Sequence, residues 1–598
     1  MAATAKQPQV RCLFKFLPGS KFLRPSEPQA QALEAIRATH KSGIVVLPCG
    51  AGKTAVFLQA ALEAGNRVLF LNFEKQGVVQ VADTIREHTN VKDAHLCVYS
   101  SEVKRDPNHL LCYMCTTYSM FSSTSNRSNE TNKVRNFVLK TPWDLVVLDE
   151  CHHAYAETYR PLVEELLKTS KRVLGFTGTL CRSETVASAG ASTSARREAH
   201  AKQFAFIGEV LYSRTCAELE AAGLIAKVRR MEVAVCLTDH FRVAHAEACG
   251  PSKMYLHALN PQKLNVVWML VQMHKAMGHV GMVFCNHLLP AKTLKAFLGE
   301  RWEVLSGGNA YGTEGTHTAQ ANADIVKRFN KGELDGLIAT PVGESALDVF
   351  NPRFRYAIVI DAHGGQAPAS QKLGRLSRTP RVFARPNETP EELAKRIKRD
   401  QKEASYYEVV TTNTEEETAA RARNIQFLDD GYDVIRVDYD KIVTHAAQID
   451  VQEQEAPFFD PAAQLKLLVD CLSYQELGVV ESEGNAKAAE VMQPLRELTK
   501  TIKKKRDTAK NPLFRERHKE RLIRTRAQIP ERKAEASVAK REVIDGAAMS
   551  EAAACVLRML QVDPKLLARA NLVLPPLPPP PSSIDADEKG DDRLVVSD

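Results

Sequence analysis

The chain is organised around residues 45–54, which read VVLPCGAGKT. The apolar run that ends at Leu47 predicts a buried strand, and the run from Ala55 to Leu62 predicts a helix. A strand, a turn of small residues, Gly-Lys-Thr and a helix together form the geometry of a phosphate-binding loop, in which backbone N–H groups face the nucleotide phosphates. The sequence therefore predicts a nucleotide site in this stretch.

The side chains of this loop have expected roles. Lys53 would reach the β- and γ-phosphates of the nucleotide, and the Thr54 hydroxyl would ligate Mg²⁺. The strict form of the motif has glycine at position 47, where this chain has Leu47. A chance Gly-Lys-Thr at a strand–helix turn is thus the alternative on this stretch alone. The residues expected to line the phosphates are Pro48, Cys49, Gly50, Ala51, Gly52, Lys53 and Thr54.

The second nucleotide-binding element is an apolar strand that ends in two carboxylates, LVVLDECH at residues 145–152. Asp149 is expected to hold Mg²⁺ through water, and Glu150 is expected to orient and polarise the water that attacks the γ-phosphate. Two acidic residues are also common at a solvated strand end. Together with the loop upstream, however, the pair favours a nucleotide-hydrolysing fold.

The composition is that of a multidomain globular protein. The 598 residues exceed what one core usually holds. No stretch approaches the roughly 18 consecutive apolar residues of a membrane span, so we expect no membrane partner. The 13 cysteines are scattered, which indicates a reduced intracellular setting. Cys112 and Cys115 form a CxxC without a second pair at zinc spacing, so we expect both in the core.

Short apolar runs alternate with helical patterns in two parts of the chain, which predicts βαβ units and parallel sheets. The fold class is therefore α/β, with two such halves in tandem. Strands are expected at 44–47, 67–71, 111–116, 145–148 and 172–176, and then at 280–285, 336–339 and 356–360. The expected domains are a lead-in (1–20), a first α/β domain (21–214), a connection (215–259), a second α/β domain (260–436), a mostly helical extension (437–570) and a Pro-rich, acidic, disordered tail (571–598).

Positive charge is concentrated in residues 496–541, which hold 17 Lys and Arg against 6 Asp and Glu, whereas the whole chain has a net charge of +8. A local excess of this kind indicates a polyanion contact or a targeting signal, and a solvated charged helix is the alternative. The run from Lys503 to Arg506 fits a nuclear import signal, a DNA contact or a solvated helix equally well.

Further motifs follow in the order found in superfamily 2 helicases. DECH at 149–152 resembles a DExH box, TGT at 177–179 resembles motif III, GESALD at 343–348 resembles motif V and QKLGRLSR at 371–378 resembles motif VI. LPCGAGKT at 47–54, TYSM at 117–120, HGG at 363–365 and QFLDDGY at 426–432 resemble the XPB family of DNA helicases. That family supplies the translocase subunit of the transcription and repair factor TFIIH. The resemblance covers roughly residues 22–435.

This resemblance implies two RecA-like domains that bind ATP and Mg²⁺ between them and run on DNA without reading bases. Roles then transfer by position. Gln29 would recognise adenine, while Gln371, Arg375 and Arg378 would face the γ-phosphate, the two arginines as arginine fingers. His152, Thr177 and Thr179 would couple the nucleotide state to cleft closure, and Arg182 would belong to the family's DNA-opening element. Thr117, Gly343 and Asp348 would contact the DNA backbone.

The resemblance further implies an ATP-dependent 3′→5′ DNA helicase or translocase in nucleotide excision repair and transcription. Its location would be the nucleus, and its partners would be DNA and repair or TFIIH-like subunits. Family members carry a damage-recognition region before the core, and only residues 1–20 precede it here, so we expect a shortened paralogue. Two alternatives stay open: a scaffold that binds nucleotide without turnover, and an RNA helicase or restriction-type motor.

Overall fold

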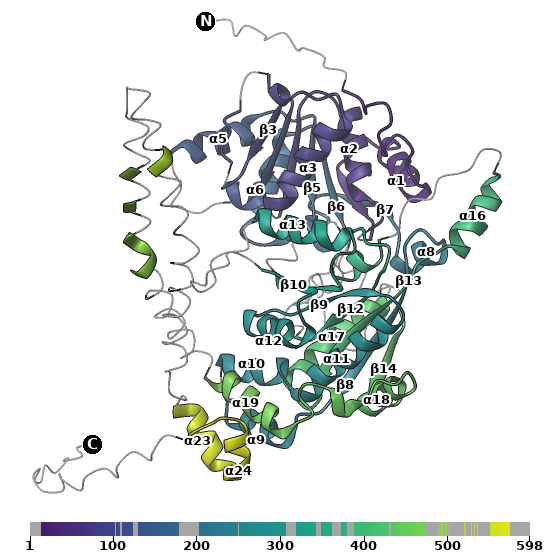
Figure 1. The fold of residues 1–598 in the computed structure, drawn as a ribbon. Coiled ribbons are helices and arrows are strands. Elements are labelled where there is room, and N and C mark those ends of the chain that lie inside the picture. Colours follow the sequence, from purple (N-terminus) through teal and green to yellow (C-terminus); the bar gives the residue numbers. More distant parts are fainter. Residues whose placement is uncertain are drawn as a thin grey trace, which may run out of the picture. The chain divides into compact units, whose positions relative to one another are not determined.

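The computed structural model describes residues 14–178, 202–473 and 551–574, apart from gaps at 49, 74, 102, 108–109, 123–128, 249, 307–318, 342–348, 362–371, 379–387 and 430–431, together with a few residues between 487 and 535 (Figure 1). The chain divides into two compact units. The first holds most of residues 14–459, and the second holds the helices that follow Asp460. The first unit contains two parallel sheets, which confirms the expected α/β fold of two halves in tandem.

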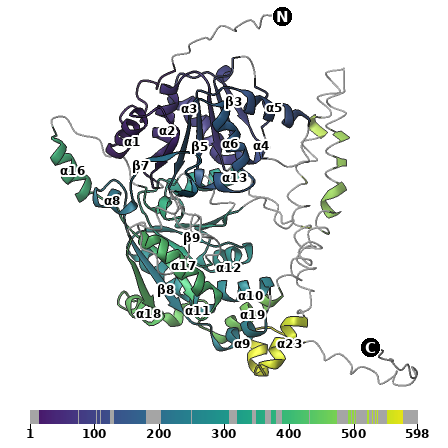
Figure 2. The ribbon, with the colours of Figure 1, turned by 180° about the vertical axis from the view of Figure 1, so that it is seen from behind.

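The first sheet has seven strands in the order β3-β4-β2-β5-β6-β1-β7, and all its pairings are parallel. It separates two apolar layers, because Val45 packs into one core cluster and Ile44 and Val46 pack into the other. Helices α1, α2 and α3 contribute to the first layer and α4, α5 and α6 to the second (Figures 1 and 2). The strands are β1 (Gly43–Val46), β2 (Val68–Asn72), β3 (Leu96–Tyr99), β4 (Tyr113–Thr117), β5 (Leu145–Asp149), β6 (Val173–Thr177) and β7 (Glu209–Ser213), and the helices are α1 (Glu27–Arg37), α2 (Lys53–Ala64), α3 (Lys75–His88), α4 (Tyr118–Phe121), α5 (Asn129–Lys140) and α6 (Arg160–Thr169).

The second sheet also has seven parallel strands, in the order β10-β11-β9-β12-β13-β8-β14. Its strands are β8 (Lys227–Val235), β9 (Val280–Phe284), β10 (Trp302–Leu305), β11 (Gly336–Ala339), β12 (Phe354–Val359), β13 (Glu403–Thr411) and β14 (Val434–Asp438). The helices in this part of the chain are α8 (Cys216–Ala221), α9 (Asp239–Glu247), α10 (Gly250–Ala258), α11 (Pro261–Ala276), α12 (Leu288–Leu298), α13 (Ala319–Asn330), α16 (Pro390–Arg399), α17 (Glu415–Asp429) and α18 (Tyr439–Ala447).

The limits of the second half differ from the expected range of 260–436. Strand β8 is hydrogen-bonded between β13 and β14, so the second sheet begins at Lys227, inside the segment expected to be a connection. At the other end, α18 packs on α11 and β14. Both additions follow from pairing across the sheet, because β8 supplies the partner that β14 and α18 need.

The second compact unit contains α19 (Pro461–Leu472), α23 (Glu551–Met559) and α24 (Pro564–Arg569). Helix α19 packs against both of the others, and an ion pair of 2.7 Å joins Arg569 to Asp460. Most of the basic segment 496–541 and the whole tail after residue 574 lie outside the described residues. None of the described helices is long and apolar enough to cross a membrane. Both cysteines of the CxxC are buried.

One buried ion pair ties the second half together and allows a stability test. Lys263 Nζ lies 2.7 Å from Glu416 Oε2, and both side chains are almost fully buried. Removing one partner of such a pair leaves a charge without compensation in the core. We expect Lys263→Met to lower the free energy of unfolding by about 3–5 kcal/mol, as measured by urea denaturation.

The matched control is Lys253→Met. Lys253 pairs with Glu415 at 2.8 Å, but these two side chains are 33% and 65% exposed. Water screens the exposed pair, so its loss should cost at most about 1 kcal/mol. If both variants lost the same free energy of unfolding, burial of the Lys263–Glu416 pair would not be the cause of the loss.

Candidate nucleotide-binding site

The loop after β1 has the backbone of a phosphate-binding turn. Gly50 has φ +90° and Gly52 has φ +84°, in the left-handed region that residues with a Cβ adopt only at a cost. Gly52 is also the N-cap of α2, so the first N–H groups of that helix face the loop. Leu47 is fully buried in the core, so this position serves packing, and a glycine there is not needed for the turn. Cys49 lies outside the described residues.

Gln29 lies against this loop. Its side-chain Nε2 donates a hydrogen bond of 2.8 Å to the Ala51 carbonyl, and its Oε1 accepts one of 3.0 Å from the Ser26 backbone N–H. The amide therefore ties the start of α1 to the phosphate loop. Its predicted recognition of adenine stays a prediction.

The two acidic residues stand at the same edge of the sheet as the loop. Parallel strands have their carboxyl ends at one edge, and β6 alone separates β5 from β1. Lys53 Nζ lies 3.3 Å from Glu150 Oε1, and their side chains are 10% and 22% exposed. The structure thus brings together the loop lysine and the carboxylate, which are separated by 97 positions in the sequence.

The two neighbouring carboxyl groups, Asp149 and Glu150, have pKa values shifted in opposite directions. Burial and the adjacent Glu150 charge raise the pKa of Asp149. Burial also acts to raise the pKa of Glu150, but the Lys53 ammonium and His152 outweigh it and lower that pKa. Glu150 is therefore ionised at neutral pH, as a group that polarises water must be. A cation beside Asp149 would compensate the charge of this half-buried carboxylate.

The oxygen donors at this edge fit Mg²⁺. The Thr54 hydroxyl at the start of α2 and the Asp149 carboxylate at the end of β5 are hard oxygen ligands, which this ion prefers. The half-buried Asp149 carboxylate stands beside the Glu150 carboxylate, and these two negative charges on consecutive residues support a cation here.

His152 and Thr177 complete a polar cluster around Glu150. His152 is 1% exposed, and its Nδ1 lies 3.0 Å from Thr177 Oγ1 and 3.4 Å from Glu150 Oε2. Thr177 is the last residue of β6, so the cluster joins the ends of two neighbouring strands. Thr179, which was predicted to act with them, lies outside the described residues, and so does Arg182, which was assigned to the family's DNA-opening element.

The predicted arginines come from the second half of the same compact unit. A Cβ built on Gly50 would lie 3.3 Å from the Gly374 carbonyl and 3.7 Å from Arg378 Cγ. The helical residues 372–376, which carry Arg375, therefore end beside the phosphate loop. Gln371, Gly343 and Asp348 lie outside the described residues.

Thr117 stands apart from this constellation. It ends β4, and β2 lies between β4 and β5. Its Oγ1 lies 3.0 Å from Ser119 Oγ. Its predicted contact with the DNA backbone stays a prediction.

Sequence reasoning missed the next residue, Tyr118. Its hydroxyl donates a hydrogen bond of 3.1 Å to the backbone carbonyl of Asp149. The side chain is fully buried, and burial strongly raises its pKa, so the hydroxyl keeps its proton. The only signal in the sequence was its place within the TYSM segment.

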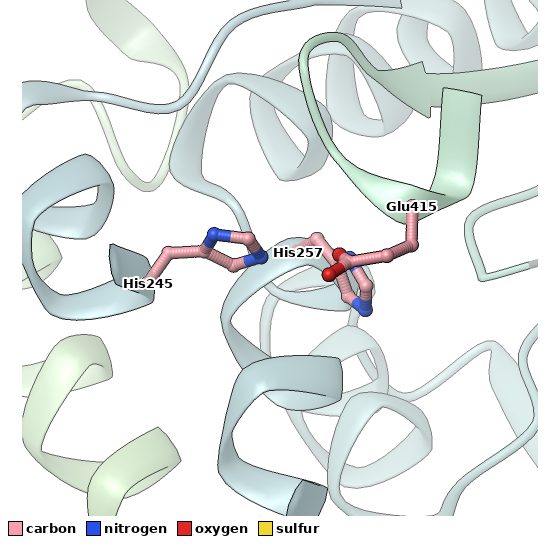
Figure 3. Close-up of side chains that lie close together, drawn as sticks. All are labelled: His245, His257 and Glu415. Atoms are coloured by element: carbon pink, nitrogen blue, oxygen red, sulfur yellow. The ribbon is translucent and has the colours of Figure 1, made fainter. Parts of the chain in front are cut away.

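A second group of possible metal ligands is drawn in Figure 3. His257 on α10 and Glu415 on α17 belong to the first compact unit, and His245 belongs to the second. Glu415 Oε1 lies 2.8 Å from Lys253 Nζ, so its charge already has a cationic partner. We assign no metal to this group.

The sequence is similar to known families and proteins over most of its length. Residues 22–182 match the model of the type III restriction enzyme res subunit, and residues 219–505 match the ERCC3/RAD25/XPB C-terminal helicase. The chain is 27% identical over 394 residues to the general transcription and DNA repair factor IIH helicase/translocase subunit XPB of Schizosaccharomyces pombe, covering 66% of this chain and 44% of that protein.

Other relatives have the same description. The XPB/SSL2 subunit of Saccharomyces cerevisiae is 26% identical, over 68% of this chain and 43% of its own length. The Danio rerio XPB subunit is 25% identical, over 74% of this chain and 50% of its own. The chain spans about half the length of the curated relatives it matches.

Solved structures give weaker likenesses. S. cerevisiae Dbp5 bound to RNA and ADP BeF3 has a TM-score of 0.46 at 12% identity, over 72% of this chain and 94% of that one. The restriction-modification enzyme LlaBIII bound to DNA has a TM-score of 0.47 at 10% identity, over 92% of this chain and 43% of that one. We draw no conclusion about function from either.

Proposed function

Because the chain is an XPB-like family member, we propose that it is an ATP-driven DNA helicase or translocase of the DExH type. The observation that carries this proposal is the cluster of Lys53, Glu150 and His152 beside a phosphate-binding turn. A scaffold would not need a lysine and an ionised carboxylate 3.3 Å apart at the loop.

The proposed chemistry is transfer of the γ-phosphoryl group of ATP to water. Lys53 pairs with Glu150, and the phosphates compete for the same ammonium because they are also anions. That competition releases the Glu150 carboxylate to orient and polarise the water. Thr54 and Asp149 would hold Mg²⁺, which when bound neutralises charge on the β- and γ-phosphate oxygens.

The second half of the motor supplies the remaining charges. Arg378 and Arg375 would stabilise the negative charge that develops on the transferred group, and Gln371 would contact the γ-phosphate or the water. Gln29 would place the adenine, while His152, Thr177 and Thr179 would couple the nucleotide state to closure of the two halves. Closure driven by ATP and reversed by hydrolysis would produce movement along DNA.

The biological setting is also a proposal. The descriptions of the relatives as subunits of a transcription and DNA repair factor support a nuclear role in DNA repair and transcription. Nucleotide excision repair as the pathway and 3′→5′ polarity are further parts of the proposal. Backbone contacts from Thr117, Gly343 and Asp348 would hold the DNA, and Arg182 would belong to the element that opens it. Repair or TFIIH-like subunits would be the protein partners.

The test is the ATPase rate of the purified chain without nucleic acid and with duplex DNA, single-stranded DNA or RNA. We expect DNA to stimulate turnover and Lys53→Ala to abolish it, because the lysine is the loop's contact with the phosphates. Lys168→Ala, on the exposed side of α6, is the control. Absence of DNA stimulation, with Lys53→Ala equal to wild type, would favour the scaffold, and stronger stimulation by RNA would favour an RNA helicase.

A further inference from the structure

The backbone at Glu150 is in a strained conformation. Its φ is +47°, in the left-handed region. The other described non-glycine residues with positive φ are Asn413, Asp450, Gln561 and Asn571. A residue keeps such a conformation only where its surroundings hold it. The turn that follows, η2 (Cys151–Tyr155), must therefore be fixed by neighbouring side chains.

One side of this turn is fixed by β6. Cys151 is fully buried and packs against Gly175. A Cβ added to Gly175 would lie only 2.9 Å from the Cys151 sulfur. His152 forms its hydrogen bond to Thr177, at the end of the same strand. These contacts hold the turn from only one of the two strands beside β5.

The other side is fixed by an aromatic stack. Phe73, the first residue after β2, lies face to face with His153, with ring centroids 3.6 Å apart and planes inclined by 6°. Strand β2 is the neighbour of β5 opposite β6. The Tyr159 ring meets the Phe73 ring edge-on at 6.3 Å and lies 5.6 Å from the ring of Tyr118, whose hydroxyl binds the Asp149 carbonyl.

The stack reaches the proposed water-orienting group through adjacent residues. The rings of His152 and His153 are 4.1 Å apart, and His152 contacts Glu150. A shift of His153 therefore moves the residue that contacts the carboxylate. Small displacements of a reacting group cost large factors in rate.

We propose that Phe73 and His153 form a positioning pair that holds the Glu150 turn in its active conformation and thereby sets the rate of ATP hydrolysis. Phe73 acts through His153 and touches no reacting atom. This inference rests on the proposed function, since it concerns turnover at the same site.

The exposure of Phe73 makes the pair testable. The side chain is 39% exposed, so removing the ring leaves the apolar core intact. Phe137 on α5 is the matched control, because it is 38% exposed, belongs to the same half and meets Trp143 edge-on at 6.4 Å, but has no place in the contacts around Glu150.

The experiment compares Phe73→Ala, Phe73→Tyr and Phe137→Ala by two readouts. The first is kcat and KM for ATP with DNA, and the second is hydrogen exchange of backbone amides in residues 149–155. We expect Phe73→Ala to lower kcat roughly 10-fold to 100-fold with little change in KM, and to accelerate exchange. Phe73→Tyr keeps the ring, so it should restore both values, and Phe137→Ala should leave both at wild-type level.

Each other result decides against the pair. Unchanged kcat in Phe73→Ala overturns the inference, with or without faster exchange. An equal loss in Phe137→Ala would assign the effect to general destabilisation. If the wild-type chain hydrolyses no ATP, the proposed function fails, while the exchange readout still reports separately whether the stack holds the turn; unchanged exchange would then overturn that as well.

Discussion

Replacing Glu150 by glutamine should lower the ATP turnover number roughly 10²- to 10⁴-fold, the range for loss of a positioned proton acceptor. Glutamine keeps the size of the side chain but removes its charge, so it cannot accept a proton or polarise water to the same degree. Binding of ATP should survive, because Lys53 loses the carboxylate 3.3 Å from its ammonium and is more available to the phosphates. Turnover is measured by phosphate release and binding by a fluorescent ATP analogue.

A matched variant separates this effect from a change of net charge. Glu164→Gln removes the same charge from α6, where the side chain is 44% exposed and pairs with Arg160. It should hydrolyse ATP like the wild type. Wild-type turnover in Glu150→Gln would show that a different residue orients the water.

The loop and the acid pair were predictable because their signals are local. A buried strand, a glycine turn and a helix follow one another within residues 43–64, and the carboxylates directly follow β5. Their proximity was inferred from motif order, yet the contact itself depends on the strand order β5-β6-β1. No local sequence pattern predicts that strand order.

Strands β8 and β13 were missed because they carry buried charges. Arg230 and Glu232 in β8 and Glu408 in β13 are at most 5% exposed, so the segments do not read as apolar runs. Glu408 pairs with Arg423 of α17, and Glu232 with Arg436 of β14, 204 positions further along the chain. Partners this far apart cannot be matched from one sequence.

The side chains behind Glu150 escaped sequence reasoning for a related reason. Phe73 and His153 are separated by 80 positions, and Tyr118 and Asp149 by 31. Each contact joins the end of one strand to the end of another. Only the register of neighbouring strands brings such residues together, and motif patterns describe the residues that meet the nucleotide but not those that hold them.

Replacing Arg378 by alanine should lower ATP turnover by about 10³-fold or more, as for other arginines that stabilise phosphoryl transfer. Gly50 approaches the Arg378 Cγ, so the arginine stands beside the phosphate loop although it belongs to the second half. Turnover is measured with saturating DNA, and ATP binding with the fluorescent analogue. Arg399→Ala is the control, since that side chain is 73% exposed on α16 and pairs with Asp400.

The comparison with Arg378→Lys distinguishes stabilisation of the transferred group from simple attraction of ATP. Lysine keeps the positive charge but lacks the planar pair of donors that matches phosphate oxygens. If Arg378 acts on the transition state, lysine should restore ATP affinity but little of the turnover. If it only attracts the nucleotide, lysine should restore both. Because Lys53 and Glu150 come from the first half and Arg378 from the second, the first result would mean that neither half hydrolyses ATP alone, and that bringing the halves together is the step that controls hydrolysis.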